Sequence, residues 1–234
     1  MMNKRIHLHG FEVQSDLLCA LADSIVADLS KAIVQKGYAI LLVSGGSTPK
    51  HLFELLRTKE LDWSSVRIGL CDERWIDPAH QDSNERFVKT YLMKEKAASA
   101  VFVGMYYENL SPQEAQSHCD KVVRELLWPC DVAILGMGED AHTASLFPLN
   151  EKLSEAFDLN NEALCVTVVP QGAPHARMSL TLSALLSVEH LYLHFEGKKK
   201  QAVFQEAING SDCYAMPIRS VLHQDIKDIE VNYA

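Results

Sequence analysis

The sequence predicts an α/β fold, in which a mainly parallel, twisted sheet carries helices on both faces of one Rossmann-like domain over residues 1–234. Short apolar segments of strand length alternate along the chain with longer segments whose apolar residues recur at helical spacing. Such alternation is typical of parallel strands joined by helices that cover the sheet. A length of 234 residues with 47% hydrophobic content suffices for one large core, and no Pro/Gly/Ser-rich linker divides it.

Local signals place the individual elements in chain order. Residues 15–36 form the first helix, because leucines and isoleucines recur there at helical spacing and Gly37 supplies a stop. Ser83 or Asn84 caps a helix that runs to position 93, and Ser111 caps one that runs to position 128. The other expected elements are buried strands at 39–43, 66–71, 132–135, 164–169 and 191–195, helices at 49–56 and 198–208, and a segment of mixed pattern at 178–186.

Composition and charge exclude several classes of protein. The net charge of -9 repels polyanions, so we expect no nucleic-acid partner, although a local cluster of cations can still hold a small anion. The first residues lack a secretory signal, and no segment approaches the ~18 apolar residues needed to span a bilayer, so we expect a cytoplasmic protein without a membrane partner. The six cysteines lack C-x-x-C spacing, which favours reduced thiols over disulfides or a zinc ribbon. No sequence signal indicates an oligomeric state.

The strongest functional signal is the stretch 131–148, which reads DVAILGMGEDAHTASLFP. An apolar strand there runs into a glycine-rich turn that carries Asp140 and His142. Imidazole has a pKa of about 6.5, so it can remove a proton from water near neutral pH, and a neighbouring carboxylate can orient it. We therefore predict that His142 is a general base assisted by Asp140. Ser145 is not expected to be a nucleophile, because it does not stand in a G-x-S-x-G elbow.

The glycines of this stretch also fit a loose dinucleotide-binding pattern. Gly136, Gly138 and Ala141 match G-x-G-x-x-A after a strand. A dinucleotide turn opens a long helix, whereas Pro148 would interrupt one here. The acidic residues at the expected distance, in 155–158, lie in a polar connection rather than at a strand end. We expect no nicotinamide or flavin cofactor.

A second polar cluster follows the strand at 39–43. Gly45 and Gly46 allow close approach of the backbone to a ligand, while Ser47 and Thr48 offer hydroxyl groups at the start of a helix. This arrangement predicts an anion cradle. It lacks the G-K-[ST] of a Walker motif, so a nucleotide triphosphatase is not expected, and an ordinary capped turn is the alternative.

A third cluster, Asp72-Glu73-Arg74, follows the strand at 66–71. The planar guanidinium of Arg74 can donate two hydrogen bonds to a phosphate. Asp72 and Glu73 can hold that arginine, bind sugar hydroxyls or form a structural ion-pair network. Because ligands of parallel sheets bind beyond the carboxyl ends of the strands, we expect all three clusters to share one pocket.

Three strings together resemble the glucosamine-6-phosphate isomerase/6-phosphogluconolactonase superfamily, and its lactonase branch in particular. VSGGSTP, then DERW followed by DSNERF, then GMGEDAHTASLFP occur in the family's order and approximate spacing, within a match over 41–200. The deaminase branch typically reads D-G-H-I-A-F-N-E-P after the strand, and its glutamate is absent here. One departure is Ala141, which stands where most lactonases have glycine. A positive φ at that position would cost alanine roughly 1 kcal/mol.

The resemblance implies a pentose-phosphate-pathway enzyme that hydrolyses 6-phospho-D-glucono-1,5-lactone to 6-phosphogluconate without a metal or organic cofactor. It also implies that Arg177, in RMSLT, and Lys200, in the G-x-x-K element, bind the 6-phosphate. His142 would activate water for attack on the lactone C1, and nearby backbone N–H groups would stabilise the oxyanion.

Two alternatives remain open. One is a glucosamine-6-phosphate deaminase/isomerase, which would share the fold and the cradle. The other is a non-catalytic sugar-phosphate-sensing domain. Against the sensor, we expect no helix-turn-helix or basic segment before the domain, and a sensor would not require Asp140 and His142.

Overall fold

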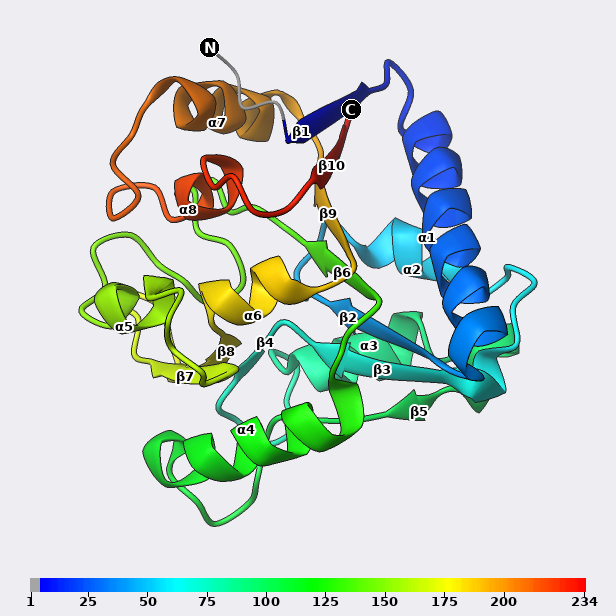
Figure 1. Ribbon diagram of the computed structural model, residues 1–234, viewed down its shortest axis with the longest axis horizontal. Coiled ribbons are helices and arrows are strands. Elements are labelled where there is room, and N and C mark those ends of the chain that lie inside the picture. The colour runs from blue at the N-terminus through cyan, green and yellow to red at the C-terminus, as the bar shows by residue number, and fades with distance from the viewer. Residues whose placement is uncertain (1–4) are drawn as a thin grey trace.

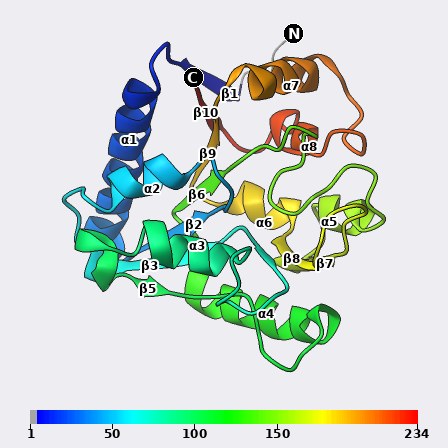
Figure 2. The ribbon, with the colours of Figure 1, turned by 180° about the vertical axis from the view of Figure 1, so that it is seen from behind.

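A seven-stranded parallel sheet forms the centre of the molecule, with helices on both of its faces (Figures 1 and 2). The computed structural model describes residues 5–234. The strand order is β1-β10-β9-β6-β2-β3-β5, and every neighbouring pair is parallel. The strands of this sheet are β1 (Ile6–Gly10), β2 (Ala39–Val43), β3 (Val66–Leu70), β5 (Val101–Phe102), β6 (Val132–Leu135), β9 (His190–Phe195) and β10 (Ile229–Tyr233).

The helices follow the strands along the chain as the alternating pattern predicts. Their bounds are α1 (Gln14–Lys36), α2 (Lys50–Leu56), α3 (Asn84–Tyr91), α4 (Pro112–Leu127), α5 (Leu153–Phe157), α6 (Leu182–Ser187), α7 (Lys198–Asn209) and α8 (Ile218–Leu222). Both predicted caps are present. Ser83 accepts the N–H of Arg86 at the start of α3, and Ser111 forms a capping box with Glu114 at the start of α4. Gly37 ends α1 in the left-handed conformation.

A second, smaller sheet corrects the predicted topology. The segment expected as a strand at 164–169 does form a strand, β7 (Cys165–Val168), but outside the main sheet. It pairs in antiparallel fashion with β8 (Arg177–Leu180), and β8 pairs with β4 (Asp72–Arg74). The mixed segment at 178–186 accordingly contains the end of β8 and most of α6. Apolar composition predicts that a strand is buried but does not identify its partner strand.

The core includes the whole of β2, an interior strand of the main sheet. All five of its residues are buried, as expected for a parallel strand covered on both faces. Leu41 lies between Ile68 of β3 and Val132 of β6, so three apolar strands share one register. Within the described part of the chain, no helix combines the length and the apolar character needed to cross a membrane.

Asp131, directly before β6, ties three elements together at the opposite end of the strands from the polar clusters. One carboxylate oxygen accepts the backbone N–H of Ile40 at 2.7 Å. The other forms an ion pair of 2.8 Å with Lys36, in the last turn of α1. The carboxylate is largely buried. It therefore supplies a hydrogen-bond acceptor for the buried N–H of Ile40 and a counter-charge for Lys36.

We expect Asp131→Ala to lower the free energy of unfolding by about 1–3 kcal/mol, because the buried N–H of Ile40 loses its acceptor. Chemical denaturation followed by circular dichroism measures the change. Asp23→Ala is the matched control, since Asp23 is 68% exposed and forms a surface ion pair with Lys59; its effect should stay below about 1 kcal/mol. Equal losses in the two variants would contradict the proposed role of Asp131.

Candidate active site

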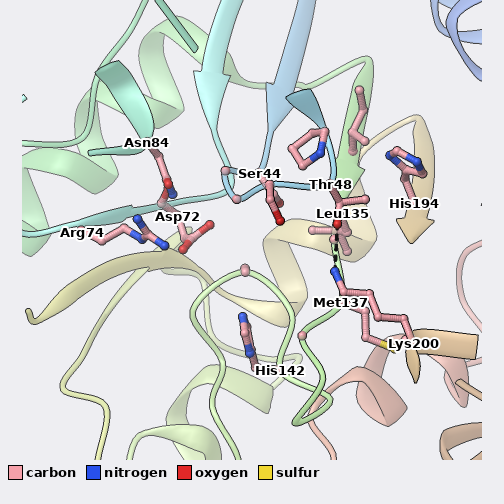
Figure 3. A pocket seen from close by; sticks show the side chains of 18 residues that line it. Ser44, Thr48, Asp72, Arg74, Asn84, Leu135, Met137, His142, His194 and Lys200 are labelled. Carbon is pink, nitrogen blue, oxygen red and sulfur yellow. Dashed lines mark hydrogen bonds between the residues drawn. The ribbon is translucent and has the colours of Figure 1, made fainter. Parts of the chain in front are cut away.

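A pocket opens where the loops after β2, β3 and β6 meet, and it brings most of the predicted site residues together. Figure 3 shows Asp72 and Arg74 on one side of it, Thr48, Lys200 and His194 on the other, and His142 between the two groups. The residues predicted from the sequence that line this pocket are Gly45, Gly46, Ser47, Thr48, Asp72, Arg74, His142 and Lys200. The shared edge of a parallel sheet explains why segments so distant in sequence converge here.

His142 and Asp140 form a hydrogen-bonded pair. The ring Nδ1 lies 2.5 Å from Asp140 Oδ1, and the backbone N–H of His142 donates to the same oxygen at 3.2 Å. Burial raises the pKa of Asp140, but the hydrogen bond and charge of His142 outweigh it, and the net pKa lies below the ordinary value. The carboxylate is therefore an acceptor for Nδ1–H. This tautomer leaves Nε2 with a lone pair that can take a proton.

The loop that carries His142 and Asp140 requires a glycine at position 138. A Cβ atom added at Gly138 would overlap both the His142 ring and the Asp140 carboxylate, so only glycine fits beneath them. Ala141 adopts the left-handed conformation considered above, with φ of 66°, and its methyl group is buried. Its N–H donates to the carbonyl oxygen of Gly138, which closes the turn. Gly138 thus serves the histidine–aspartate pair, and the next helix does not begin until Leu153.

The cradle and Lys200 form one cationic group in the pocket. The ammonium of Lys200 donates to Thr48 Oγ1 at 2.9 Å (Figure 3). Gly45 lies against Asn84, whose amide would overlap a Cβ atom at this position. Gly46 has φ of 100°, which favours glycine. Burial lowers the pKa of Lys200, against the opposing charges of nearby carboxylates.

Arg74 and Arg177 form a second cationic group, which the small sheet builds. They stand directly opposite each other in the β4–β8 pairing. Arg177 is largely buried, and burial followed by the charge of Arg74 lowers its pKa. It does not line the pocket of Lys200 but an adjoining one, which shares Asp72, Arg74 and His142 with the first. The phosphate ligands expected from the sequence are therefore divided between two sides of His142.

Backbone carbonyl groups hold both arginines. Arg74 donates from Nη1 to the carbonyl oxygen of Asp82. Arg177 donates from Nη1 to the carbonyl oxygens of Pro174 at 2.6 Å and His175 at 2.7 Å. The two loops that contain these acceptors thus position the guanidinium groups.

The two carboxylates beside Arg74 have different roles. Asp72 faces the pocket and accepts a hydrogen bond of 2.6 Å from the hydroxyl of Ser145. Ser145 is buried and therefore positions Asp72. Glu73 points away from the pocket and belongs to the start of α3.

Glu73 is fully buried and satisfies the first turn of α3. Its carboxylate accepts the backbone N–H groups of Asn84 and Glu85, each at 2.7 Å. It also accepts the N–H of Arg74 at 2.7 Å and the hydroxyl of Ser83 at 3.0 Å. Burial raises the pKa of Glu73 to about 7, while these four donors oppose the rise. Glu73 therefore does not form the structural ion pair considered from the sequence but caps the N-terminus of α3.

Two residues that line the pocket, Ser44 and His194, were not predicted as ligands from the sequence. Ser44 Oγ and His194 Nδ1 are buried and have no hydrogen-bond partner among residues 5–234. Both side chains line the pocket (Figure 3). The other ring nitrogen of His194 lies 3.0 Å from Glu196, two residues further along the same face of the chain. Buried polar atoms normally have partners, so these two atoms point to contacts with a ligand or water.

Comparison with known proteins places this site in a family. A family model described as glucosamine-6-phosphate isomerases/6-phosphogluconolactonase matches residues 12–229. The chain belongs to this family. A 6-phosphogluconolactonase of Rhizobium meliloti (strain 1021) is 40% identical over 228 residues, which cover 97% of this chain and 98% of that relative. A 6-phosphogluconolactonase of Neisseria meningitidis serogroup B (strain MC58) is 38% identical over 229 residues, covering 97% of this chain and 98% of its own.

Solved structures agree with the sequence comparison. The crystal structure of a 6-phosphogluconolactonase from Shewanella baltica OS155 is 39% identical and matches with a TM-score of 0.94, covering 100% of this chain and 99% of that one. A putative 6-phosphogluconolactonase from Neisseria gonorrhoeae FA 1090 gives a TM-score of 0.90 at 37% identity, covering 98% and 99% of the two chains. The family resemblance drawn from the sequence strings is confirmed.

We expect Glu73→Gln to lower the free energy of unfolding by about 1–3 kcal/mol at a pH of about 8, where the carboxyl group is ionised. The amide would turn its own N–H donors toward the donors of α3. Thermal and chemical denaturation measure the loss. Glu125→Gln is the control, because Glu125 is 60% exposed and forms a 3.9 Å surface pair with Lys121. Unchanged stability in Glu73→Gln would show that capping by the carboxylate is unimportant.

Proposed function

We propose that this protein hydrolyses 6-phospho-D-glucono-1,5-lactone to 6-phosphogluconate, in the cytoplasmic pentose phosphate pathway, with the whole chain acting as one catalytic domain. The observation that carries the proposal is the carboxylate-held imidazole of His142, which faces a pocket with cations on two sides. Relatives that share most of the chain are named 6-phosphogluconolactonase.

The division of the cations suits a substrate that becomes anionic at both ends. The 6-phosphate binds the cradle at Ser47 and Thr48, beside the ammonium of Lys200. Hydrolysis converts the neutral lactone C1 into a carboxylate, so negative charge develops at the opposite end. Arg74 lies on that side of His142 (Figure 3), Arg177 stands opposite it in the β4–β8 pairing, and both stabilise this charge.

The chemistry proceeds by general acid–base catalysis. His142 Nε2 removes a proton from a water molecule as the water oxygen attacks C1, and Asp140 stabilises the resulting imidazolium. A tetrahedral oxyanion forms. It collapses with cleavage of the bond between C1 and the ring oxygen, and the imidazolium returns its proton to that oxygen. The N–H of Gly138 already donates to the carbonyl oxygen of His142, so this N–H does not serve the oxyanion and the charge of Arg74 does.

Ser44 and His194 contact the hydroxyl groups of the sugar. When Nε2–H of His194 donates to Glu196, its buried Nδ1 carries a lone pair that accepts a hydroxyl proton. Ser44 Oγ can donate or accept in the same pocket. A sugar ring bound here would satisfy both unpaired atoms.

We expect His142→Ala to lower the rate of lactone hydrolysis at least 100-fold while the fold remains intact, because general base catalysis contributes about 10² to 10⁴. Acid release from freshly prepared lactone, corrected for spontaneous hydrolysis, measures the rate. Asp140→Asn should give an intermediate loss, because Nδ1 keeps a neutral acceptor. His223→Ala changes an exposed histidine outside the pocket and is the control.

Two results would contradict this assignment. Comparable turnover by wild type and His142→Ala would remove the proposed base. Ammonia release from glucosamine 6-phosphate, with no acid release from the lactone, would favour the deaminase alternative.

We expect the affinity for 6-phosphogluconate to fall as the pH rises through the lowered pKa of Lys200, starting below the 10.5 of an ordinary lysine. A pKa depressed by burial means that the ammonium loses its proton, and its attraction for phosphate, at a lower pH. The phosphate is already a dianion above its second pKa of about 6. Calorimetric titrations between about pH 7 and pH 10 test this. Lys200→Arg should keep its affinity across the range, since arginine stays charged; equal pH profiles would contradict the role of Lys200.

A further inference from the structure

We propose that His80, Asp82 and His175 form a binding site for a late first-row divalent metal ion, for which zinc is the probe. One ligand atom from each of these side chains lies within 4.8 Å of the other two. Neither His142 nor Asp140 belongs to the cluster, although Asp82 and His175 line the adjoining pocket together with His142. The proposal does not depend on the proposed function.

Two of the three distances between ligand atoms require only a small contraction on metal binding. Asp82 Oδ2 lies 3.5 Å from His175 Nε2 and 3.8 Å from His80 Nδ1. Ligands bound at about 2.0–2.2 Å in a tetrahedral zinc site stand roughly 3.4 Å from one another. The two aspartate–histidine distances are therefore close to those of a loaded site, and the two imidazole rings already meet edge to face, with centroids 5.7 Å apart.

The donor set is the one that late first-row ions prefer. Two imidazole nitrogens and one carboxylate oxygen suit zinc, copper, nickel and cobalt better than calcium or magnesium. His80 Nδ1 accepts the backbone N–H of Asp82 at 3.2 Å, so this ring nitrogen is the unprotonated one, and metal coordination would replace that hydrogen bond. The three side chains are between 26% and 42% exposed, which leaves the remaining coordination positions to water.

The ligands come from two loops that the fold already holds together. His80 and Asp82 lie between β4 and α3, and His175 lies between β7 and β8. The backbone N–H of Trp75 donates to the carbonyl oxygen of Ala176 at 2.8 Å across the two loops. His175 has φ of 68°, an uncommon value for a residue other than glycine, and its Nε2 lies 3.5 Å from Asp82 Oδ2. Much of the ordering that a metal site needs therefore exists before an ion binds.

A bound ion would also affect the arginines of the adjoining pocket. The carbonyl oxygens of Asp82 and His175 accept hydrogen bonds from Arg74 and Arg177. An ion that links the two loops would hold these acceptors in place. The same guanidinium charges oppose a further cation, so we expect binding that is reversible and removed by a chelator.

The alternative interpretation is that Asp82 simply forms ion pairs with two protonated histidines. Both interpretations predict close approach of the three side chains, but only the metal site predicts saturable binding of one ion at a pH where histidine is neutral. A pH of about 7.5 satisfies this condition for ordinary histidines.

The test is equilibrium titration of the whole chain with zinc chloride at about pH 7.5, after treatment with a chelator. The protein carries Cys19→Ser and Cys213→Ser, because these thiols are not buried and also bind zinc. We expect one equivalent to bind, and His80→Gln, Asp82→Asn and His175→Gln each to weaken that binding at least tenfold. His142→Gln and His223→Gln should leave it unchanged. Melting curves in chelator confirm that each variant is folded.

Three outcomes would overturn the proposal. One is the absence of saturable zinc binding in the protein that carries Cys19→Ser and Cys213→Ser. Another is unchanged binding in folded His175→Gln and Asp82→Asn. The third is loss of binding in His142→Gln, which would place the ion at the catalytic pair. Because none of these readouts measures lactone hydrolysis, failure here leaves the proposed function intact.

Discussion

The close approach of the Asp140 and His142 side chains to the backbone at Gly138 governs the geometry of the whole site. A 2.5 Å hydrogen bond between a ring nitrogen and a carboxylate two residues away requires a tight turn, and no side chain fits beneath the pair at position 138. Ala141 completes the turn at φ of 66°. The end of β6 therefore presents one imidazole nitrogen to the pocket and shields the other from it.

The small antiparallel sheet gives the parallel sheet a second wall. The loops of the main sheet supply the cradle and His142, whereas β4 and β8 bring Arg74 opposite Arg177. Burial, and then the charge of Arg74, lower the pKa of Arg177, and the two neighbouring guanidinium groups repel each other. Their hydrogen bonds to loop carbonyl groups hold them together nevertheless. Such a pair gains most from a bound anion, which suits the charge that lactone opening creates.

Much of the fold follows from local patterns in the sequence, and the exceptions have physical causes. Runs such as 39–43 and 132–135 are buried on both faces, so apolar content alone marks them as strands. Hydroxyl caps at Ser83 and Ser111 mark helix starts for the same local reason. The partners of the strand at 164–169 depend on tertiary packing, so its place in the second sheet was not predicted. Three polar residues at 72–74 form a strand for that reason too.

The site residues divide in the same way: some are marked by the sequence around them, and others are brought together only by tertiary contacts. Clusters that directly follow strands predicted most of the pocket lining, because the ends of parallel strands meet at one edge. The direction of a long side chain is not encoded locally, which explains why Arg177 lies in the adjoining pocket and not beside Lys200. His194 stands within a strand whose apolar pattern conceals it. His80 and His175 are far apart in the chain, so no ligand spacing reveals their proximity.

Because Glu73 caps α3, the backbone of Arg74 is fixed independently of the surface loop between β4 and α3. Since the carboxylate fastens the end of β4 to the start of α3, the polypeptide between them leaves and returns at nearly the same point. Insertions or exchanges within 77–79, which keep His80 and Asp82, would then be absorbed as a longer excursion on the surface, with little change in the anchor of Arg74. This part of the chain can diverge among relatives, and remodel the rim of the cleft, without disturbing the machinery below it.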